Sequence, residues 1–231
     1  MVITQQRNIV TRTWHSSVGK KSVVAVTGIV FLLYVIAHML GNLKIFFGLQ
    51  TFDAYSEHLR TLGAEIVGYE GLLWIIRVVL VGSLVLHVVA TVSLWRRANH
   101  ARPIGYQHRQ KVAGSYTART MRWGGVIILL FVIWHILDLT TGTVNPLPGD
   151  AGAYEKLIAS FDRPVVAIFY ILAVVALGLH IGHGLWSAMQ TLGGNSAARQ
   201  ASLKTFAYVV ATVITVGFVI VPISVLTGLV G

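Results

Sequence analysis

The chain has 231 residues, of which 55% are hydrophobic and only 11% are charged. Soluble globular proteins carry about 25% charged residues, so this composition excludes a chain that presents its surface to water. The sequence contains no cysteine, which excludes a disulfide, a thiolate-bound iron–sulfur cluster, a Cys-type zinc site and a covalently attached c-type haem within the chain. We therefore expect an all-α integral membrane protein in which histidine is the main soft metal ligand.

Five segments are apolar enough to cross a bilayer, which takes about 20 residues in a helix. They cover residues 22–47, 71–95, 122–142, 164–190 and 205–230. We expect them to form one transmembrane domain, residues 1–231, built as a five-helix bundle. The polar stretch before the first span lacks a small-residue cleavage site, so we expect this span to be retained.

The net charge of +10 would suit a protein that binds nucleic acid, but the distribution of charge along the chain favours a membrane topology without nucleic acid. Thirteen of the 18 basic residues lie before the first span, between the second and third spans, or between the fourth and fifth. All eight acidic residues lie in the other loops or at the adjoining span ends. The positive-inside rule then predicts a cytoplasmic N-terminus. The basic side could also dock a soluble partner or anionic lipid, although topology alone explains the charges equally well.

The first four spans form an internal repeat of two helical hairpins, aligned on histidine. Residues 29–41 read IVFLLYVIAHMLG and residues 126–138 read VIILLFVIWHILD, which aligns His38 with His135. The second and fourth spans align in the same way on His87 and His180. Apolar helices match easily by chance, but a histidine at the equivalent place in four consecutive spans is a stronger signal. The fifth span has no histidine, and we expect it only to pack against the others.

The four histidines fall at two depths in the predicted membrane. At about 1.5 Å per residue, His38 and His135 lie roughly 25 and 20 Å from the cytoplasmic ends of their spans, whereas His87 and His180 lie roughly 13 and 15 Å away. Two histidines at one depth on facing helices suit the two axial ligands of one haem iron. The pattern predicts two b-type haems, an outer one on His38 and His135 and an inner one on His87 and His180.

Other uses of these histidines stay open at this point. A single histidine on an apolar helix is most often a hydrogen-bonded core residue, although ionisable groups within a membrane are usually functional. A metal transporter would need carboxylates beside the histidines, and only Asp138, three residues after His135, is a candidate. A proton relay of histidines would not need pairs at equal depth. Gly178 and Gly182, which flank His180, could admit a flat macrocycle or allow ordinary close helix packing.

The stretch from Gly19 to Gly48, GKKSVVAVTGIVFLLYVIAHMLGNLKIFFG, is followed by FDAYSEHL. With one histidine in each of the first four spans, it resembles the cytochrome b membrane-anchor subunits of succinate dehydrogenases and fumarate reductases, of the single-chain, five-span, dihaem type. The resemblance implies a multi-pass protein of the cell inner (plasma) membrane, bound on its cytoplasmic side to a flavoprotein and an iron–sulfur subunit. The whole complex would be a succinate:quinone oxidoreductase (respiratory complex II), in which two haem b groups pass electrons to a membrane quinone.

Neither succinate oxidation nor cluster chemistry can reside in this chain, because it has no dinucleotide fingerprint and no cysteine. A haem-b anchor of another dehydrogenase, such as a hydrogenase or formate dehydrogenase, and a haem-free histidine-containing transporter remain alternatives. The sequence leaves open the physiological direction of the reaction and the oligomeric state of the complex.

Further polar residues are candidates for contacts with haem propionates or quinone. The resemblance places the fourth-span ligand at His180, so His183, one turn further on, would contact a propionate, line a site or make an interior hydrogen bond. The propionate or pocket candidates are His183, Ser187, Arg77 and Lys21. The quinone candidates are Arg77 and Asp138 near the outer side, and Trp14, His15, Ser16, Ser17 and Lys20 near the cytoplasm. Arg77 could equally extend to the outer headgroups.

An outer haem predicts electron transfer that reaches the outer half of the membrane. Moving a charge across the membrane potential is worth about 2.3 kcal/mol per 100 mV. This favours a low-potential quinone such as menaquinone, because the potential could help to drive electrons outward from succinate. The alternative is an outer haem that only tunes potentials or stabilises the fold.

Overall fold

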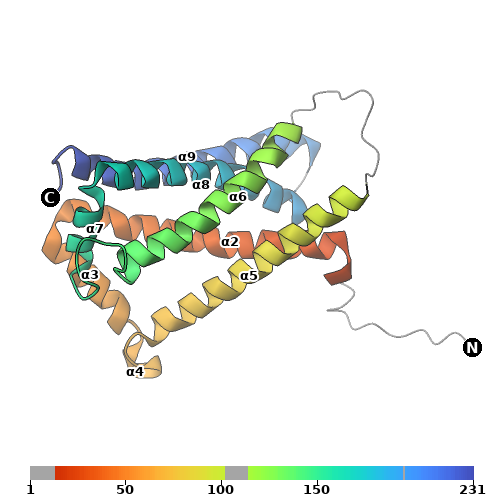
Figure 1. The fold of residues 1–231 in the computed structure, drawn as a ribbon. Coiled ribbons are helices and arrows are strands. Elements are labelled where there is room, and N and C mark those ends of the chain that lie inside the picture. The colour runs from red at the N-terminus through yellow and green to blue at the C-terminus, as the bar shows by residue number, and fades with distance from the viewer. Residues whose placement is uncertain (1–13, 102–113, 195) are drawn as a thin grey trace, which may run out of the picture.

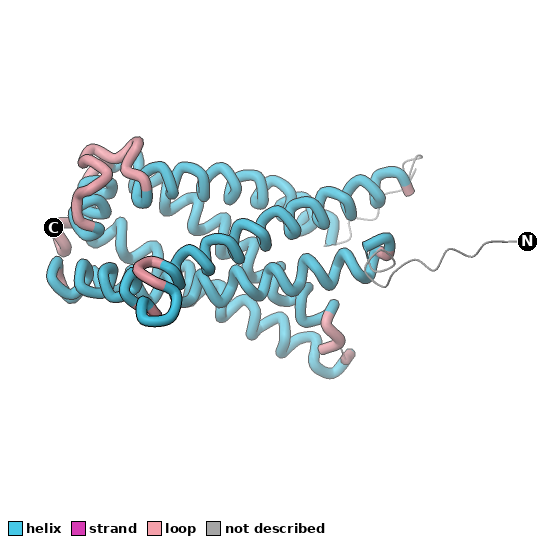
Figure 2. The backbone as a smooth tube through the Cα atoms, turned by 90° about the horizontal axis from the view of Figure 1, so that it is seen from below, coloured by secondary structure: helices cyan, strands magenta, loops and turns pink. Residues whose placement is uncertain are grey.

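The computed structural model describes residues 14–101, 114–194 and 196–231, and these residues form helices and loops without a strand (Figure 2). Within them, five segments are long and apolar enough to cross a membrane. They are α2 (Ser17–Asn42) with a 3-10 turn (Leu43–Phe47), α5 (Gly71–His100), α6 (Gly114–His135) with a π-helical turn (Ile136–Thr140), α8 (Pro164–Thr191) and α9 (Gln200–Leu226). The predicted all-α membrane bundle is therefore confirmed.

The ends of four spans lie within about five residues of the ends predicted from hydropathy, whereas α6 begins at Gly114, eight residues before the predicted start at residue 122. The first span begins earlier than predicted, at Ser17, and the fifth begins at Gln200 and ends at Leu226. Polar residues extend these helices beyond their apolar stretches because they still make helical hydrogen bonds. At the start of α2 the Ser16 hydroxyl accepts a hydrogen bond from the Gly19 amide at 2.8 Å, which satisfies one of the free amides of the first turn.

The long helices run between two ends of the molecule (Figure 1). At one end α2 begins, α5 ends, α6 begins, α8 ends and α9 begins. We call this the basic end, because it carries Lys20, Lys21, Arg96, Arg97, Arg122, Arg199 and Lys204. The opposite end holds the short helices α3 (Leu49–Thr61), α4 (Ala64–Val67) and α7 (Ala153–Phe161). We call it the acidic end, because it carries Asp53, Glu57, Glu65, Glu70, Asp150, Glu155 and Asp162. The basic residues Arg7, Arg12, Arg102, Arg109 and Lys111 lie outside the described residues, as does the side chain of Arg119.

Helices α2, α8 and α9 contact one another, while α5 packs against α2 and α6 against α8. Helix α8 packs most extensively against α9. Two glycines explain the close contact of α8 with α9. A Cβ atom at Gly178 would overlap the Thr215 side chain, and one at Gly182 would lie 3.1 Å from the Tyr208 ring. Small residues allow helices to approach within a bilayer, so these glycines admit α9 and not a macrocycle.

The two hairpins are joined at the acidic end by α3 and α7, which hydropathy alone did not place. The Asp53 carboxylate on α3 accepts a hydrogen bond from the Tyr154 amide in the first turn of α7 at 3.0 Å. The rings of Phe52 and Tyr154 lie edge to face, 6.1 Å apart. A continuous buried core at this end includes Ile45, Phe52, Phe131, Leu157, Phe161, Ala167, Tyr170, Ala173, Val221 and Val225.

Candidate functional site

Two histidines from different hairpins face each other towards the acidic end. The ring centroids of His38 on α2 and His135 at the end of α6 are 5.7 Å apart, with planes at 88°. Tyr34 stacks on His38 at 5.4 Å, one helical turn earlier in α2. Tyr170 of α8 lies 5.9 Å from the His135 ring, edge to face. Aromatic side chains therefore pack against both imidazoles.

A second pair lies closer to the basic end. The rings of His87 on α5 and His180 on α8 are 6.5 Å apart, with planes at 51°. A glycine of the preceding helix stands beside each imidazole. A Cβ at Gly28 would lie 3.8 Å from His87 Cε1, and one at Gly125 would lie 3.9 Å from His180 Cε1. Both glycines precede the outer histidine of their hairpin by the same number of residues. The sequence analysis missed them, although extending the repeat alignment by one residue would have found them.

The two pairs fit bis-histidine haem. A metal–imidazole bond is about 2.0 to 2.1 Å, which puts the centroids of two imidazoles on opposite sides of one metal about 6 Å apart. The observed 5.7 and 6.5 Å lie on either side of that value. The Nδ1 atoms of His135 and His180 are buried without a hydrogen-bond partner among the described residues. The described part of the chain contains no group of three or more His, Cys, Asp or Glu side chains that could hold a metal by itself.

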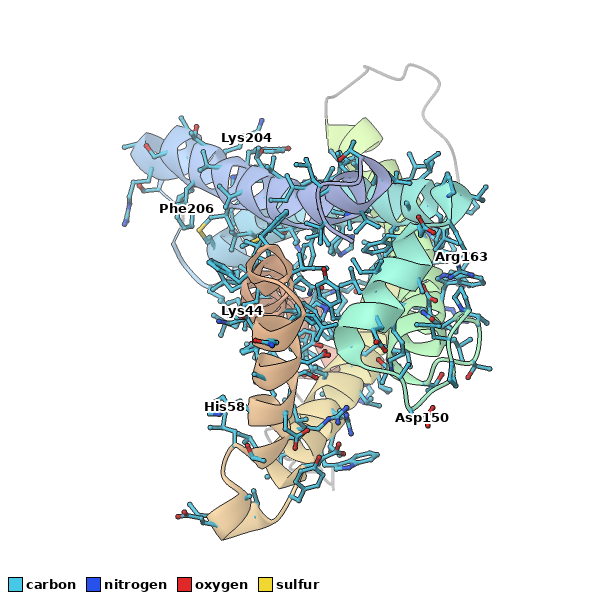
Figure 3. All side chains as sticks on the ribbon, turned by 90° about the vertical axis from the view of Figure 1, so that its left-hand side faces the viewer. Lys44, His58, Asp150, Arg163, Lys204 and Phe206 are labelled. Atoms are coloured by element: carbon cyan, nitrogen blue, oxygen red, sulfur yellow. The ribbon has the colours of Figure 1, made fainter. Side chains whose placement is uncertain are left out.

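Asp138, a sequence candidate for a quinone or metal contact, is instead enclosed by protein. Its side chain is 0% exposed and sits in the π-helical turn that follows His135. Four side chains donate hydrogen bonds to its carboxylate, at 2.5 to 3.2 Å: Ser160, Tyr170, Asn145 and Arg163. Figure 3 views the acidic end and shows Arg163 on the side of the molecule opposite His58. A carboxylate that is only an acceptor and already has four donors is a structural anchor, and the quinone contact suggested for Asp138 has no support in this geometry.

Arg77, the other outer candidate, lies near the acidic end of α5. Its guanidinium Nη1 is 3.6 Å from a Glu70 carboxylate oxygen, and its Cζ lies 4.8 Å from the Trp74 ring centroid. Arg60 reaches the other Glu70 oxygen at 3.6 Å. Arg77 is therefore partnered but only partly covered, with 41% of its side chain exposed.

The cytoplasmic candidates separate into buried and exposed residues at the basic end. Lys20 is buried, its amine bonds to the Ser93 hydroxyl of α5 and it lies over the Trp14 ring at 5.5 Å. Its neighbour Lys21 is exposed. The side chains of His15 and Ser17 are also exposed, while Ser16 serves as the cap of α2. The structure thus brings Trp14 and Lys20 together and leaves Lys21, His15 and Ser17 on the surface.

The remaining candidates lie on α8, nearer the basic end than His180. The His183 ring meets Trp186 edge to face at 5.8 Å. Ser187 is half-buried, and its carbonyl accepts a hydrogen bond from the Thr191 hydroxyl at 2.9 Å. The part of His183 and Ser187 in a propionate contact stays a prediction.

This fold defines a class of protein: an all-α, multi-pass membrane protein with half-buried histidines paired between helices at two levels. A family model of succinate dehydrogenase/fumarate reductase transmembrane subunits matches residues 98–220, which is more than half of the chain. The chain belongs to that family, in agreement with the resemblance of its first hairpin. The matched residues include His135 and His180, while His38 and His87 lie before them.

A named relative agrees with the family. The succinate dehydrogenase cytochrome b558 subunit of Bacillus subtilis (strain 168) is 27% identical over 82 residues, which cover 36% of this chain and 39% of the relative. The chain therefore aligns with less than half the length of that relative. No solved structure matches the chain.

Proposed function

We propose that this chain is the haem-carrying membrane anchor of a succinate:quinone oxidoreductase and that it holds two b-type haems. The observation that carries the proposal is the pair of imidazole–imidazole contacts, at 5.7 and 6.5 Å, between helices of a twofold sequence repeat. Membership of the family supports a cytochrome b membrane subunit. The number of haems, the ligand assignment and the quinone chemistry are the parts that we add.

Each histidine pair would hold one haem from opposite sides. When bound, the two haems supply one-electron carriers at two levels of the membrane. His87 and His180 would hold the inner one, towards the basic end, where we propose that the flavoprotein and iron–sulfur subunits dock. His38 and His135 would hold the outer one. Gly28 and Gly125 leave room beside the inner imidazoles for a flat macrocycle, because neither presents a side chain there.

We propose that quinone reacts at the outer level and that menaquinone is the natural substrate. The guanidinium of Arg77 can donate hydrogen bonds to a quinone carbonyl, and its partly exposed position at the acidic end of α5 leaves it accessible from the membrane. An electron delivered there has crossed most of the bilayer, so the membrane potential contributes to the driving force. Buried Lys20 and Trp14 mark the alternative quinone position, beside the docked subunits.

The orientation proposed here has the N-terminus in the cytoplasm and the chain in the cell inner membrane. Its support is the separation of charge between the basic and acidic ends together with the positive-inside rule. Accessibility labelling of single cysteines is unambiguous in a chain without native cysteine. A cysteine near Lys21 should react only from the cytoplasmic side, and one near Glu65 only from the outside.

Haem analysis of the full chain, purified with its co-purifying subunits, tests the proposed function. We expect two b-type haems per chain in reduced-minus-oxidised spectra and in a quantitative haem assay. His38→Ala or His135→Ala should remove the outer haem preferentially, and His87→Ala or His180→Ala the inner one. One haem or none would contradict the pairing.

Two further outcomes would redirect the proposal. If His183→Ala removes the inner haem while His180→Ala retains it, the ligand on α8 is misassigned. If the co-purifying subunits carry no flavin, the chain anchors a different dehydrogenase, such as a hydrogenase. Flavin and iron–sulfur clusters together with succinate-dependent haem reduction select the succinate complex.

A further inference from the structure

One of the four paired histidines is tied to a side chain of the facing helix. Thr27 of α2 is buried, with 6% of its surface exposed, and its hydroxyl oxygen lies 2.9 Å from Nδ1 of His87 on α5. The same hydroxyl lies 2.7 Å from the Val23 carbonyl oxygen and 3.2 Å from that of Val24. The contact joins the two helices of the first hairpin at the level of the inner pair.

The direction of this hydrogen bond follows from counting protons. A threonine hydroxyl has one proton and two lone pairs, and a carbonyl oxygen only accepts. The shortest contact of Thr27, to Val23, takes the hydroxyl proton. His87 must then donate from Nδ1–H to the hydroxyl oxygen. The lone pair is therefore left on Nε2.

We infer that Thr27 is a positioning residue for His87: its hydroxyl oxygen accepts the Nδ1 proton, fixes the imidazole tautomer and ring orientation, and leaves Nε2 free to bind iron. The inference rests on the proposed function. A hydrogen bond from the distant ring nitrogen makes an imidazole a stronger donor to its metal, which stabilises the oxidised iron. Thr27 should therefore hold the reduction potential of the inner haem lower than an apolar residue would.

The arrangement differs from that of His180 and His135. The Nδ1 atoms of His180 and His135 are buried without a hydrogen-bond partner in the described part of the chain. His180, the proposed second ligand of the inner haem, thus has no equivalent of Thr27. Within the inner pair, the hydrogen bond that would strengthen an iron ligand is the one from His87 to Thr27. A single substitution at Thr27 should therefore reveal its effect.

A redox titration of Thr27 variants tests the inference on the full chain purified with its partner subunits. Thr27→Val has a similar shape but no acceptor, and we expect the inner haem midpoint potential to shift in the positive direction while the outer potential stays unchanged. Thr27→Ser restores the hydroxyl and should return the potential to the wild-type value. If Thr27→Val does not assemble, Thr27→Cys, whose thiol is a weak acceptor, replaces it.

Thr227→Val is the matched control, because the Thr227 hydroxyl, like that of Thr27, donates to carbonyls of its own helix, Ile223 at 2.9 Å and Ser224 at 3.3 Å, but lies at the acidic end of α9; its potentials should equal those of the wild type. The inference is overturned if Thr27→Val leaves the inner potential unchanged, or if Thr27→Ser shifts it as much as Thr27→Val. Such a result leaves the proposed function intact as long as two haems are present. Retention of the inner haem in His87→Ala would instead overturn the ligand assignment itself.

Discussion

The guanidinium of Arg163 lies 3.2 Å from the carboxylate of Asp138, and this ion pair joins the turn after α6 to the residue that precedes α8. Asp138 is fully buried, whereas about a third of the Arg163 side chain is exposed. Ionised carboxylates are costly to bury without donors. Ser160 and Tyr170 add hydroxyl donors from α7 and α8, so one carboxylate fixes three segments around His135.

Asp138→Asn should destabilise the chain and disturb the outer histidine pair. The NH₂ group of an asparagine would face the hydroxyls and the guanidinium, which are donors themselves, so buried polar groups would be left unpaired. The expected loss in the free energy of unfolding is about 2 to 4 kcal/mol. Thermal unfolding in detergent should show a lower midpoint, together with an altered spectrum of the outer haem. Tyr170→Phe removes one donor and should cost only about 1 kcal/mol. Asp150→Asn, on an exposed residue, is the control; a variant at Asp138 as stable as that control would refute a structural role.

Side chains placed beside the inner imidazoles should exclude the inner haem. Gly125→Val would extend methyl groups into the space next to His180, where even a Cβ lies within 3.9 Å of the ring. We expect haem content to fall towards one per chain, with the outer haem retained. Gly124→Val is a matched control one residue away, because a Cβ at Gly124 meets nothing within 4 Å. Equal haem content in the two variants would argue against a macrocycle at this level.

The contact between the hairpins at the acidic end should contribute measurably to stability. Asp53→Ala removes the carboxylate that accepts the Tyr154 amide, and losing an acceptor in the first turn of a helix costs about 0.5 to 2 kcal/mol. We expect the midpoint of thermal unfolding to fall accordingly. Asp162→Ala changes an exposed carboxylate at the opposite end of α7 and should have little effect. If the unfolding midpoint falls by a similar amount in both variants, the loss of a negative charge, and not of the hydrogen bond to Tyr154, explains the lower stability.

Succinate:quinone activity in sealed vesicles should depend on the membrane potential. If quinone is reduced at the outer level, collapsing the potential with an uncoupler should slow menaquinone reduction, because outward electron transfer loses part of its driving force. Arg77→Leu should weaken quinone binding, seen as a raised KM. Arg60→Leu is the matched control, since Arg60 pairs with the same Glu70 at the same 3.6 Å but lies on α3, outside the spans. If the rate does not change with the uncoupler and KM is unchanged in Arg77→Leu, the outer position is wrong, and the quinone site lies instead at Trp14 and Lys20.

The spans and the facing of the histidines were accessible from sequence because both follow from simple periodicities. Apolar length fixes where helices cross a membrane, and the 1.5 Å rise per residue fixes which histidines share a level. His38 and His135 lie far apart in sequence, yet counting residues from the span ends was enough to place them opposite each other. Their role as haem ligands remains a prediction.

The features that could not be predicted from the sequence depend on how the helices pack against one another. The role of Asp138 follows from a π-helical turn, whose wider hydrogen bonding has no composition signal, and from donors on two later helices. Hydropathy likewise could not distinguish Lys20 from Lys21, although one is buried against Ser93 and the other exposed. Gly178 and Gly182 carried the signal for close approach, and only the structure shows that α9 is the neighbour.

The π-helical turn after His135 has a consequence for the symmetry of the bundle. Gly41 of the first hairpin is the repeat equivalent of Asp138, and it is pressed against the Tyr55 ring, without charge. The two halves are thus alike around the inner histidines, where Gly28 mirrors Gly125, but differ in charge around the outer ones. Any unsymmetrical planar molecule between His38 and His135 has different side chains on its two flanks. The second hairpin carries the buried Asp138–Arg163 pair, whereas the first carries Gly41 against Tyr55, with Lys44 5.0 Å from the Tyr55 ring centroid. Such a molecule has two distinguishable orientations at the outer level, because the two hairpins are not equivalent there.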